Sequence, residues 1–184
     1  MRGFIHKSCV FYFAYFIIFM VSFSSCRSHK EILSSDSEKT SVFYKKKIQT
    51  KYAGLLNVEE NKIENLKLYL FIDEWLGVAY KYGGKNKSGI DCSNFASTIY
   101  SNVYTKSLTG TSSSIFNQCN IISKNNLEEG DLVFFKIEGT TISHMGVYLQ
   151  NNKFVHASTK KGVMIDDLDE DYYKKYYYKG GRIK

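Results

Sequence analysis

The stretch that most constrains the fold is YKYGGKNKSGIDCSNFASTIY, residues 80–100, which sets Cys92 directly after a glycine-containing turn. Phe95, Ile99 and Val103 follow at intervals of four residues, which puts three apolar side chains on one face of a helix. This spacing predicts a helix that begins at or near Cys92. Unpaired N–H groups and the helix dipole stabilise an anion there, so we expect a thiol that ionises readily and acts as a nucleophile. The alternative is a buried structural cysteine, which is common.

Two histidines downstream favour the catalytic interpretation. The segment ISHMGVYL places His144 at the head of one predicted strand, and KFVHAS places His156 in the next strand. A nucleophilic cysteine needs a base to take its proton and a third polar group to orient that base. A single histidine on a strand is usually structural, but two in adjacent strands, together with Cys92, supply all three roles.

These roles require a particular strand register, because side chains alternate between the two faces of a strand. A two-residue turn between the strands would put His144 and His156 on opposite faces of the hairpin. A three-residue loop, residues 150–152, pairs His156 with Gly146 and makes the two histidines diagonal neighbours on one face. We therefore predict a loop of odd length, with Asn152 in the left-handed backbone region that asparagine tolerates.

Five segments occur together in this chain, in the order WLGVAYKYGG, GIDCSNF, LEEGDLVFF, ISHMGVYL and FVHAS. With them, the span from Trp75 to Ile183 resembles the NlpC-type family of papain-like cysteine peptidases, which cut peptidoglycan stem peptides. The resemblance implies that Cys92 is the nucleophile, His144 the base and His156 the residue that orients the base, with acyl transfer through a covalent thioester. It implies no cofactor and no metal, and the sequence contains no HxxxH, HExxH or CxxC spacing of metal ligands.

The resemblance also implies which residues contact the substrate. Tyr80 falls where the family has a tyrosine near the oxyanion site, and Asp91 and Ser93 fall where the family holds the free amino end of the stem peptide. The usual cleavage in the family is between D-glutamate and the diamino acid of that peptide. Two departures from the family pattern leave the catalytic groups in place. Asn94 stands where glycine is usual, and LTGTSSSIF replaces a segment that often reads Pro-Arg-Thr-Ser, which affects the contacts that set substrate specificity.

Two other functions stay open. One is a non-catalytic wall-binding lipoprotein of the same fold, against which the intact cysteine and histidines argue. The other is a papain-like amidase or acyltransferase that acts on a different amide or ester. From Cys26 onward the chain has 23 Lys and Arg against 18 Asp and Glu, a net charge of +5 that suits anionic wall polymers or lipid head groups. No interleaved basic and aromatic motif indicates nucleic-acid binding. We expect a monomer whose substrate is the peptidoglycan stem peptide.

Residues 1–25 have the features of a lipoprotein signal peptide. A basic start precedes the apolar run CVFYFAYFIIFMV, which is shorter than the ~20 residues of a membrane span, and SFSSC follows, ending at Cys26. The likeness to bacterial lipoprotein signals predicts that Cys26 is lipidated and anchors the chain to a membrane of the bacterial cell envelope, facing the periplasm or wall. An ordinary secretory signal or an uncleaved anchor is the alternative. Residues 26–60, rich in Ser, Lys and Glu, are predicted to be the lipid anchor and a flexible tether.

The remaining residues, 61–184, are predicted to form the peptidase domain. A helix is expected over Asn61–Leu76, with Asn61 as its N-cap and an apolar face that includes Ile63 and Leu66. Strands are expected at DLVFFKI, HMGVYLQ, KFVHAS, GVMIDDL and YYYKGGRI. Helices first and strands later predict an α+β, papain-like fold, in which N-terminal helices, one of them starting at the nucleophile, pack on a mostly antiparallel sheet.

Overall fold

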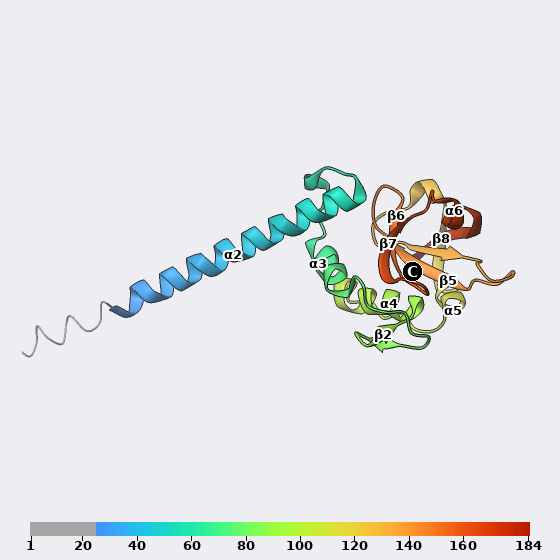
Figure 1. The fold of residues 1–184 in the computed structure, drawn as a ribbon, viewed down its shortest axis with the longest axis horizontal. Coiled ribbons are helices and arrows are strands. Elements are labelled where there is room, and N and C mark those ends of the chain that lie inside the picture. The colour runs from blue at the N-terminus through green and yellow to red at the C-terminus, as the bar shows by residue number, and fades with distance from the viewer. Residues whose placement is uncertain (1–24) are drawn as a thin grey trace, which may run out of the picture. The chain divides into compact units, whose positions relative to one another are not determined.

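The computed structural model describes residues 25–184, with side chains from residue 41 onward. The chain divides into two compact units, residues 1–47 and 48–184, and the second unit holds the sheet and the candidate site (Figure 1). The predicted signal peptide, residues 1–25, lies outside the described residues except for its last position. Within the described part of the chain, no helix is both long and apolar enough to cross a membrane.

Helix α2, Ser25–Leu56, occupies most of the segment that composition predicts to be a tether. Its C-terminal end carries an apolar stripe at intervals of four residues: Ile48, Tyr52 and Leu56 are 2%, 0% and 0% exposed. The second compact unit accordingly begins at Ile48. The residues that precede this stripe, 41–47, are exposed and include the apolar side chains of Val42, Phe43 and Tyr44, so composition alone does not mark where the buried stripe begins.

The next helix, α3, spans Leu66–Trp75 and begins later than expected. The prediction that Asn61 caps it is wrong: the cap is Asn65, whose side chain accepts a hydrogen bond from the backbone N–H of Leu68 at 3.2 Å. Asn61 instead lies in a single 3-10 turn, Glu60–Lys62. With this later start, one face of α3 is turned toward the core. That face comprises Leu68, Tyr69, Ile72 and Trp75.

A six-stranded sheet forms the second half of this unit. Its strands are β3 (Cys119–Ile122), β4 (Leu132–Phe135), β5 (His144–Tyr148), β6 (Lys153–Ser158), β7 (Gly162–Asp167) and β8 (Tyr177–Ile183). They lie in the order β3-β8-β4-β5-β6-β7, and every neighbouring pair is antiparallel. The predicted α+β fold is confirmed. The strand that was not predicted, β3, is a short edge strand whose middle residues are exposed, so it has no clear hydrophobic alternation.

Short elements connect these parts. They are the two-stranded hairpin of β1 (Lys85–Asn86) and β2 (Gly89–Ile90), helix α4 (Cys92–Ile99) with a π-helical turn (Tyr100–Tyr104), helix α5 (Ser112–Phe116), a 3-10 turn (Lys124–Asn126) and helix α6 (Asp171–Tyr176).

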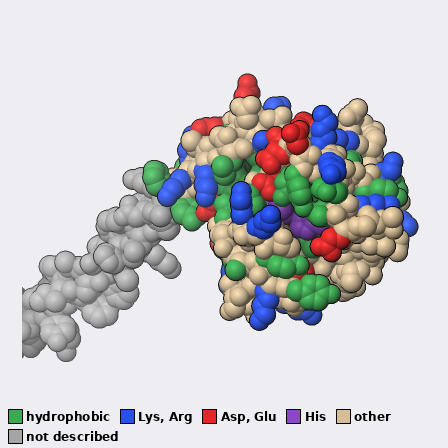
Figure 2. Space-filling model, turned by 45° about the vertical axis from the view of Figure 1, so that its right-hand side comes forward, with side chains coloured by type: hydrophobic (Ala, Val, Ile, Leu, Met, Phe, Trp, Pro, Cys, Tyr) green, Lys and Arg blue, Asp and Glu red, His purple; other side chains and the backbone are tan. Residues whose placement is uncertain are grey.

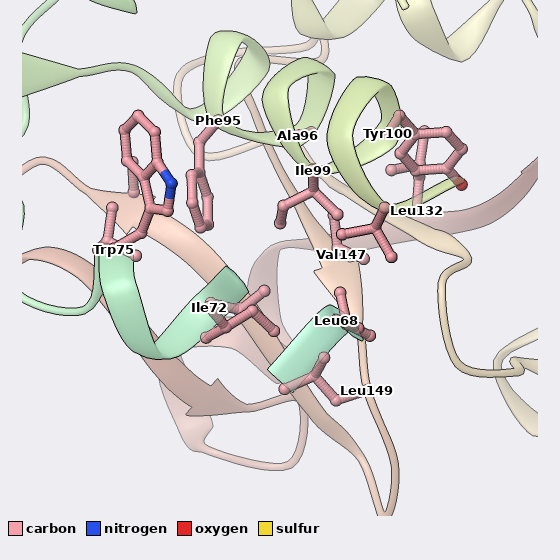
Figure 3. Close-up of a cluster of buried hydrophobic side chains, with 14 of the residues drawn as sticks. Leu68, Ile72, Trp75, Phe95, Ala96, Ile99, Tyr100, Leu132, Val147 and Leu149 are labelled. Carbon is pink, nitrogen blue, oxygen red and sulfur yellow. The ribbon is translucent and has the colours of Figure 1, made fainter. Parts of the chain in front are cut away.

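Helices α3 and α4 cover one face of the sheet. Phe95, Ile99 and Val103 are 1%, 0% and 9% exposed, which confirms the helical face predicted to follow Cys92. Figure 3 shows how side chains of α3 and α4 meet in one cluster with Leu132, Val147 and Leu149 from the sheet side. Because this core lies directly under α4, it fixes the position of the helix and of the cysteine at its start.

A smaller, largely aromatic cluster covers the opposite face. It consists of Val133, Phe135, Tyr148, Phe154, Leu168 and Tyr173. Tyr173 belongs to α6 and the others to the sheet or its connections. The rings of this cluster also contact both strand histidines, with centroids 5.8 Å apart for Phe135 and His144 and 4.9 Å apart for Phe154 and His156. Aromatic rings therefore pack against both histidines on this face of the sheet.

Candidate active site

The N-terminus of α4 is built around the carboxylate of Asp91. Its Oδ1 accepts hydrogen bonds from the backbone N–H of Asn94 at 2.7 Å and from the hydroxyl of Ser93 at 3.0 Å. Its Oδ2 accepts from the backbone N–H of Gly83 and from the side-chain amide of Asn94, each at 2.9 Å. Four donors thus occupy the acceptor sites of the carboxylate and join the helix start to the preceding loop. These contacts make Cys92 the first residue of α4, as predicted.

The thiol of Cys92 is enclosed. The residue is 7% exposed, and its Sγ lies 3.6 Å from Oγ of Ser112, the first residue of α5. Burial raises the pKa of the thiol and outweighs the hydrogen bonds from Ser112 and from the backbone N–H of Met145, which lower it. The expectation of a readily ionised thiol is therefore wrong for this site. The contact with Met145 places Sγ beside the first residues of β5, where His144 lies.

The β5–β6 hairpin has the predicted register. Tyr148 pairs with Phe154, so that Gly146 lies opposite His156. Both asparagines of the three-residue loop have positive φ, 50° and 60°, as expected for the loop end. A Cβ atom on Gly146 would lie 3.1 Å from Cβ of His156, so the glycine leaves the room that the imidazole needs. The prediction that His144 and His156 share a face is confirmed.

The two histidines are hydrogen bonded to each other. Nε2 of His144 lies 2.7 Å from Nδ1 of His156, with the ring planes 83° apart. Burial and then repulsion from His156 lower the pKa of His144, against the attraction of Asp166, which raises it. The His144 imidazole is therefore neutral near pH 7. Because its Nε2 is engaged by His156, Nδ1 is the ring nitrogen left for proton transfer.

Asp166 and Tyr173 complete this cluster, and the sequence analysis missed both. Oδ2 of Asp166 lies 2.9 Å from Nε2 of His156 and accepts a hydrogen bond from the Tyr173 hydroxyl at 2.6 Å. Burial alone would raise the pKa of the Asp166 carboxyl, but the hydrogen bonds from His156 and Tyr173 outweigh it and lower the pKa. In the β6–β7 register Phe154 pairs with Asp166, which makes Asp166 a diagonal neighbour of His156. The parity argument used for His144 would have found Asp166 if the length of the β6–β7 turn had been known.

A cavity of about 490 Å³ opens beside the histidines. In Figure 2 a small area of histidine is visible, with hydrophobic, basic and acidic side chains close around it, because His144 and His156 are only 7% and 1% exposed. The residues that line the cavity include His144, His156, Asp166 and Tyr173, together with Tyr80, Tyr82, Glu138, Ser158, Lys160, Lys161, Glu170 and Tyr172. The cavity therefore offers aromatic, acidic and basic groups to a peptide next to the candidate base.

The predicted substrate-binding residues occupy two different settings. Tyr80 lines the cavity, and the backbone bonds of its neighbours to Ile90 hold it against the start of α4. Burial, followed by the nearby Cys92 thiol and the Asp91 carboxylate, raises the pKa of its hydroxyl. Asp91 and Ser93 lie outside the residues that line the cavity and bond to each other. Their role in holding an amino group stays a prediction.

The predicted lipidation site lies far along the chain from this cluster. Cys26 is the second residue of α2, in the part of the helix whose side chains are outside the described set. Its lipidation stays a prediction.

Residues 77–182 match the model of the NlpC/P60 family, a span that contains the cysteine, both histidines, Asp166 and Tyr173. The chain belongs to the NlpC/P60 family. Two curated bacterial members of this family are similar to it. The probable endopeptidase NlpC homolog of Haemophilus influenzae is 42% identical over 111 residues, which cover 60% of this chain and 58% of that protein. The murein DD-endopeptidase MepS/murein LD-carboxypeptidase of Escherichia coli is 40% identical over 110 residues, with the same two shares.

A solved NlpC/P60 family structure, that of a protein from Bacillus cereus, has the same fold. It superposes with a TM-score of 0.58 at 25% identity and covers 64% of this chain and 39% of that protein. The matched part of this chain thus spans less than two thirds of the length of these NlpC/P60 relatives.

Proposed function

We propose that this protein is a cysteine endopeptidase that cuts the stem peptides of peptidoglycan. The observation that carries the proposal is the hydrogen-bonded pair of His144 and His156 on one face of the hairpin. Cys92, at the start of α4, contacts the backbone of Met145, the residue that follows His144. The names of the NlpC/P60 relatives, endopeptidases of murein among them, support the substrate. The bond that we propose is the one between D-glutamate and the diamino acid.

Catalysis starts from a neutral thiol and a neutral imidazole, because burial raises the pKa of Cys92 and lowers the pKa of His144. Nδ1 of His144 takes the thiol proton as Sγ attacks the scissile carbonyl. Backbone N–H groups at the start of α4, with the hydroxyl of Tyr80, stabilise the oxyanion. His144 then gives the proton to the leaving amine, and water activated by the same nitrogen hydrolyses the thioester.

This arrangement also weighs against the two alternatives. A protein that only binds the wall has no use for a buried histidine pair whose hydrogen bonds leave one imidazole nitrogen for proton transfer. An amidase or acyltransferase with another substrate would share the chemistry, and only the product distinguishes it.

The test is incubation of the full chain with purified muropeptides, followed by mass spectrometry. We expect the wild type to release products cut after D-glutamate and Cys92→Ala to release none, because the change removes the nucleophile and little volume. Cys119→Ala is the matched control, since Cys119 is equally enclosed but lies in β3 and bonds to the carbonyl of Ile115. Hydrolysis by Cys92→Ala at the wild-type rate would refute the assignment of the nucleophile. Opening of cross-links or loss of a terminal residue, without a cut after D-glutamate, would refute the proposed bond.

We further propose that the protein is a lipoprotein of the bacterial cell envelope, anchored through Cys26 and acting as a monomer. Mass spectrometry of the protein purified from membranes should show an acylated N-terminal Cys26, and Cys26→Ser should release the enzyme to the soluble fraction. Two or more acyl chains give firm attachment, whereas one alone gives only marginal attachment. An unmodified N-terminus at another residue would contradict the anchor.

A further inference from the structure

We propose that Asp166 and Tyr173 are positioning residues that set the tautomers of both histidines, so that His144 presents an unprotonated Nδ1 to Cys92. The proposal rests on the proposed peptidase function and extends its machinery from three residues to five. Neither residue is assigned a role by the resemblance or by the names of the relatives.

The hydrogen bonds of the cluster can be assigned from its acidic end. Asp166 is a carboxylate, because the hydrogen bonds that it accepts lower its pKa, and it therefore accepts hydrogen bonds only. Its Oδ2 lies 2.9 Å from Nε2 of His156, so that nitrogen carries the hydrogen. In the arrangement that we propose, this is the single ring hydrogen of His156, so that Nδ1 of His156 accepts from Nε2 of His144 across 2.7 Å. His144 consequently has no hydrogen on Nδ1, which is the form that a general base requires.

The Tyr173 hydroxyl could favour the other tautomer of His156, and Asp166 prevents this. The Tyr173 hydroxyl lies 2.6 Å from Oδ2 of Asp166 and 3.2 Å from Nε2 of His156. While it donates to the carboxylate, its oxygen can only accept from His156. Without the carboxylate the hydroxyl would donate to Nε2 of His156. That would move the hydrogen of His156 to Nδ1 and the hydrogen of His144 to its own Nδ1, and block the base.

Within the described residues, no other group is bonded to the ring nitrogens of His156 and could set its tautomer. His156 is 1% exposed, and its two ring nitrogens face His144, Asp166 and Tyr173. The other charged groups near the cluster are on the cavity wall: Lys161, which lowers the pKa of Asp166, Glu170, which raises that of Tyr173, and Glu138 and Lys160. All four are exposed, so water screens them.

The first experiment compares Asp166→Ala with the double variant Asp166→Ala/Tyr173→Phe in the full chain. We expect Asp166→Ala to lower kcat by about 10²-fold with little change in KM, since a wrong tautomer can cost more than that in a serine peptidase triad. We expect the double variant to recover part of the lost kcat, because it also removes the Tyr173 hydroxyl, which would otherwise donate to Nε2 of His156. A purely structural role predicts the reverse, with the double variant worse than the single one. Unchanged kcat in Asp166→Ala, or no recovery in the double variant, would overturn the proposal.

The second readout does not depend on turnover. Nitrogen-15 NMR of the histidine-labelled full chain, purified in detergent, reports which ring nitrogen carries hydrogen, with His144→Gln and His156→Gln to assign the signals. In the wild type, both histidines should carry the ring hydrogen on Nε2. In Asp166→Ala, both should carry it on Nδ1. Unchanged histidine signals in Asp166→Ala would refute the proposed role of Asp166, whether or not the protein hydrolyses muropeptides. A wild-type protein that hydrolyses no muropeptide would instead refute the proposed peptidase function.

The control is Asp167→Ala, which removes the neighbouring carboxylate on the other face of β7, where it pairs with Lys153 at 2.5 Å. We expect it to keep the wild-type kcat and histidine signals. If Asp166→Ala does not fold, Asp166→Val provides the same test with a residue that suits a strand.

Discussion

A single missing side chain, that of Gly146, allows the histidine pair to form. A Cβ atom there would lie 2.7 Å from Cδ2 of Phe154, 2.8 Å from the carbonyl oxygen of Val155 and 3.1 Å from Cβ of His156. Two of these atoms belong to a packed ring and a backbone, which cannot move away without cost.

We predict that Gly146→Ala lowers the free energy of unfolding by about 1–3 kcal/mol, the usual cost of overpacking, and reduces hydrolysis because it displaces His156. The matched change is Gly54→Ala in α2, where nothing lies within 4 Å of the added atom. It should raise stability by about 0.5–1 kcal/mol, since alanine is the better helix former. Urea unfolding of the two variants measures this, and equal effects of the two changes would contradict the steric argument.

Residues whose placement follows from local rules could be predicted. Cys92 follows from helical spacing, and the pairing of His144 with His156 follows from the parity of one loop. Ser112 and Asp166 could not be predicted, because each reaches the site through a connection whose length and path the sequence does not reveal. The raised pKa of Cys92 was missed for a related reason. The helix N-terminus, which favours the thiolate, can be recognised in the local sequence, whereas the burial that raises the pKa depends on the packing of the whole core.

At the level of elements, the predictions failed where a helix start depends on packing. Two asparagines, Asn61 and Asn65, could each cap α3, and the structure uses the one that turns Ile72 into the core. The buried stripe at the C-terminal end of α2 is difficult to recognise in the sequence, because it is short and follows exposed apolar residues such as Phe43. Strands β4 to β8 were easier, since each has a clear apolar or alternating run bounded by turn residues.

The apolar stripe on α2 predicts that two adjacent leucines contribute differently to the free energy of unfolding. Leu56 is 0% exposed and Leu55 is 46% exposed. Leu56→Ala should lower the free energy of unfolding by about 2–5 kcal/mol, whereas Leu55→Ala should change it by less than about 0.5 kcal/mol. Chemical unfolding of the full-length variants measures both. If the two variants are equally stable, residues 48–56 are a tether after all and the compact unit begins near residue 61.

At the scale of the whole folded unit, the buried imidazole of His144 limits stability on the acid side. Burial lowers the pKa of His144 in the folded state, against about 6.5 in an unfolded chain. Between these two values the unfolded state binds a proton that the folded state does not. The free energy of unfolding therefore falls as the pH drops below about 6.5. Asp166 does not oppose this above pH 5, because its pKa is lowered and it stays ionised.

We predict that wild-type stability falls between about pH 6.5 and pH 5 by up to about 1.4 kcal/mol per pH unit through His144 alone. His144→Gln should remove that part of the slope, whatever its effect on stability at pH 7.5, because glutamine does not titrate. Cys92→Ala is the control and should keep the slope, since the thiol is neutral throughout this range. Urea unfolding at half-unit steps of pH gives the three curves. Parallel curves for wild type and His144→Gln would mean that His144 binds its proton equally well in the folded and unfolded chains. In that case the site would not hold the neutral imidazole that the proposed base requires.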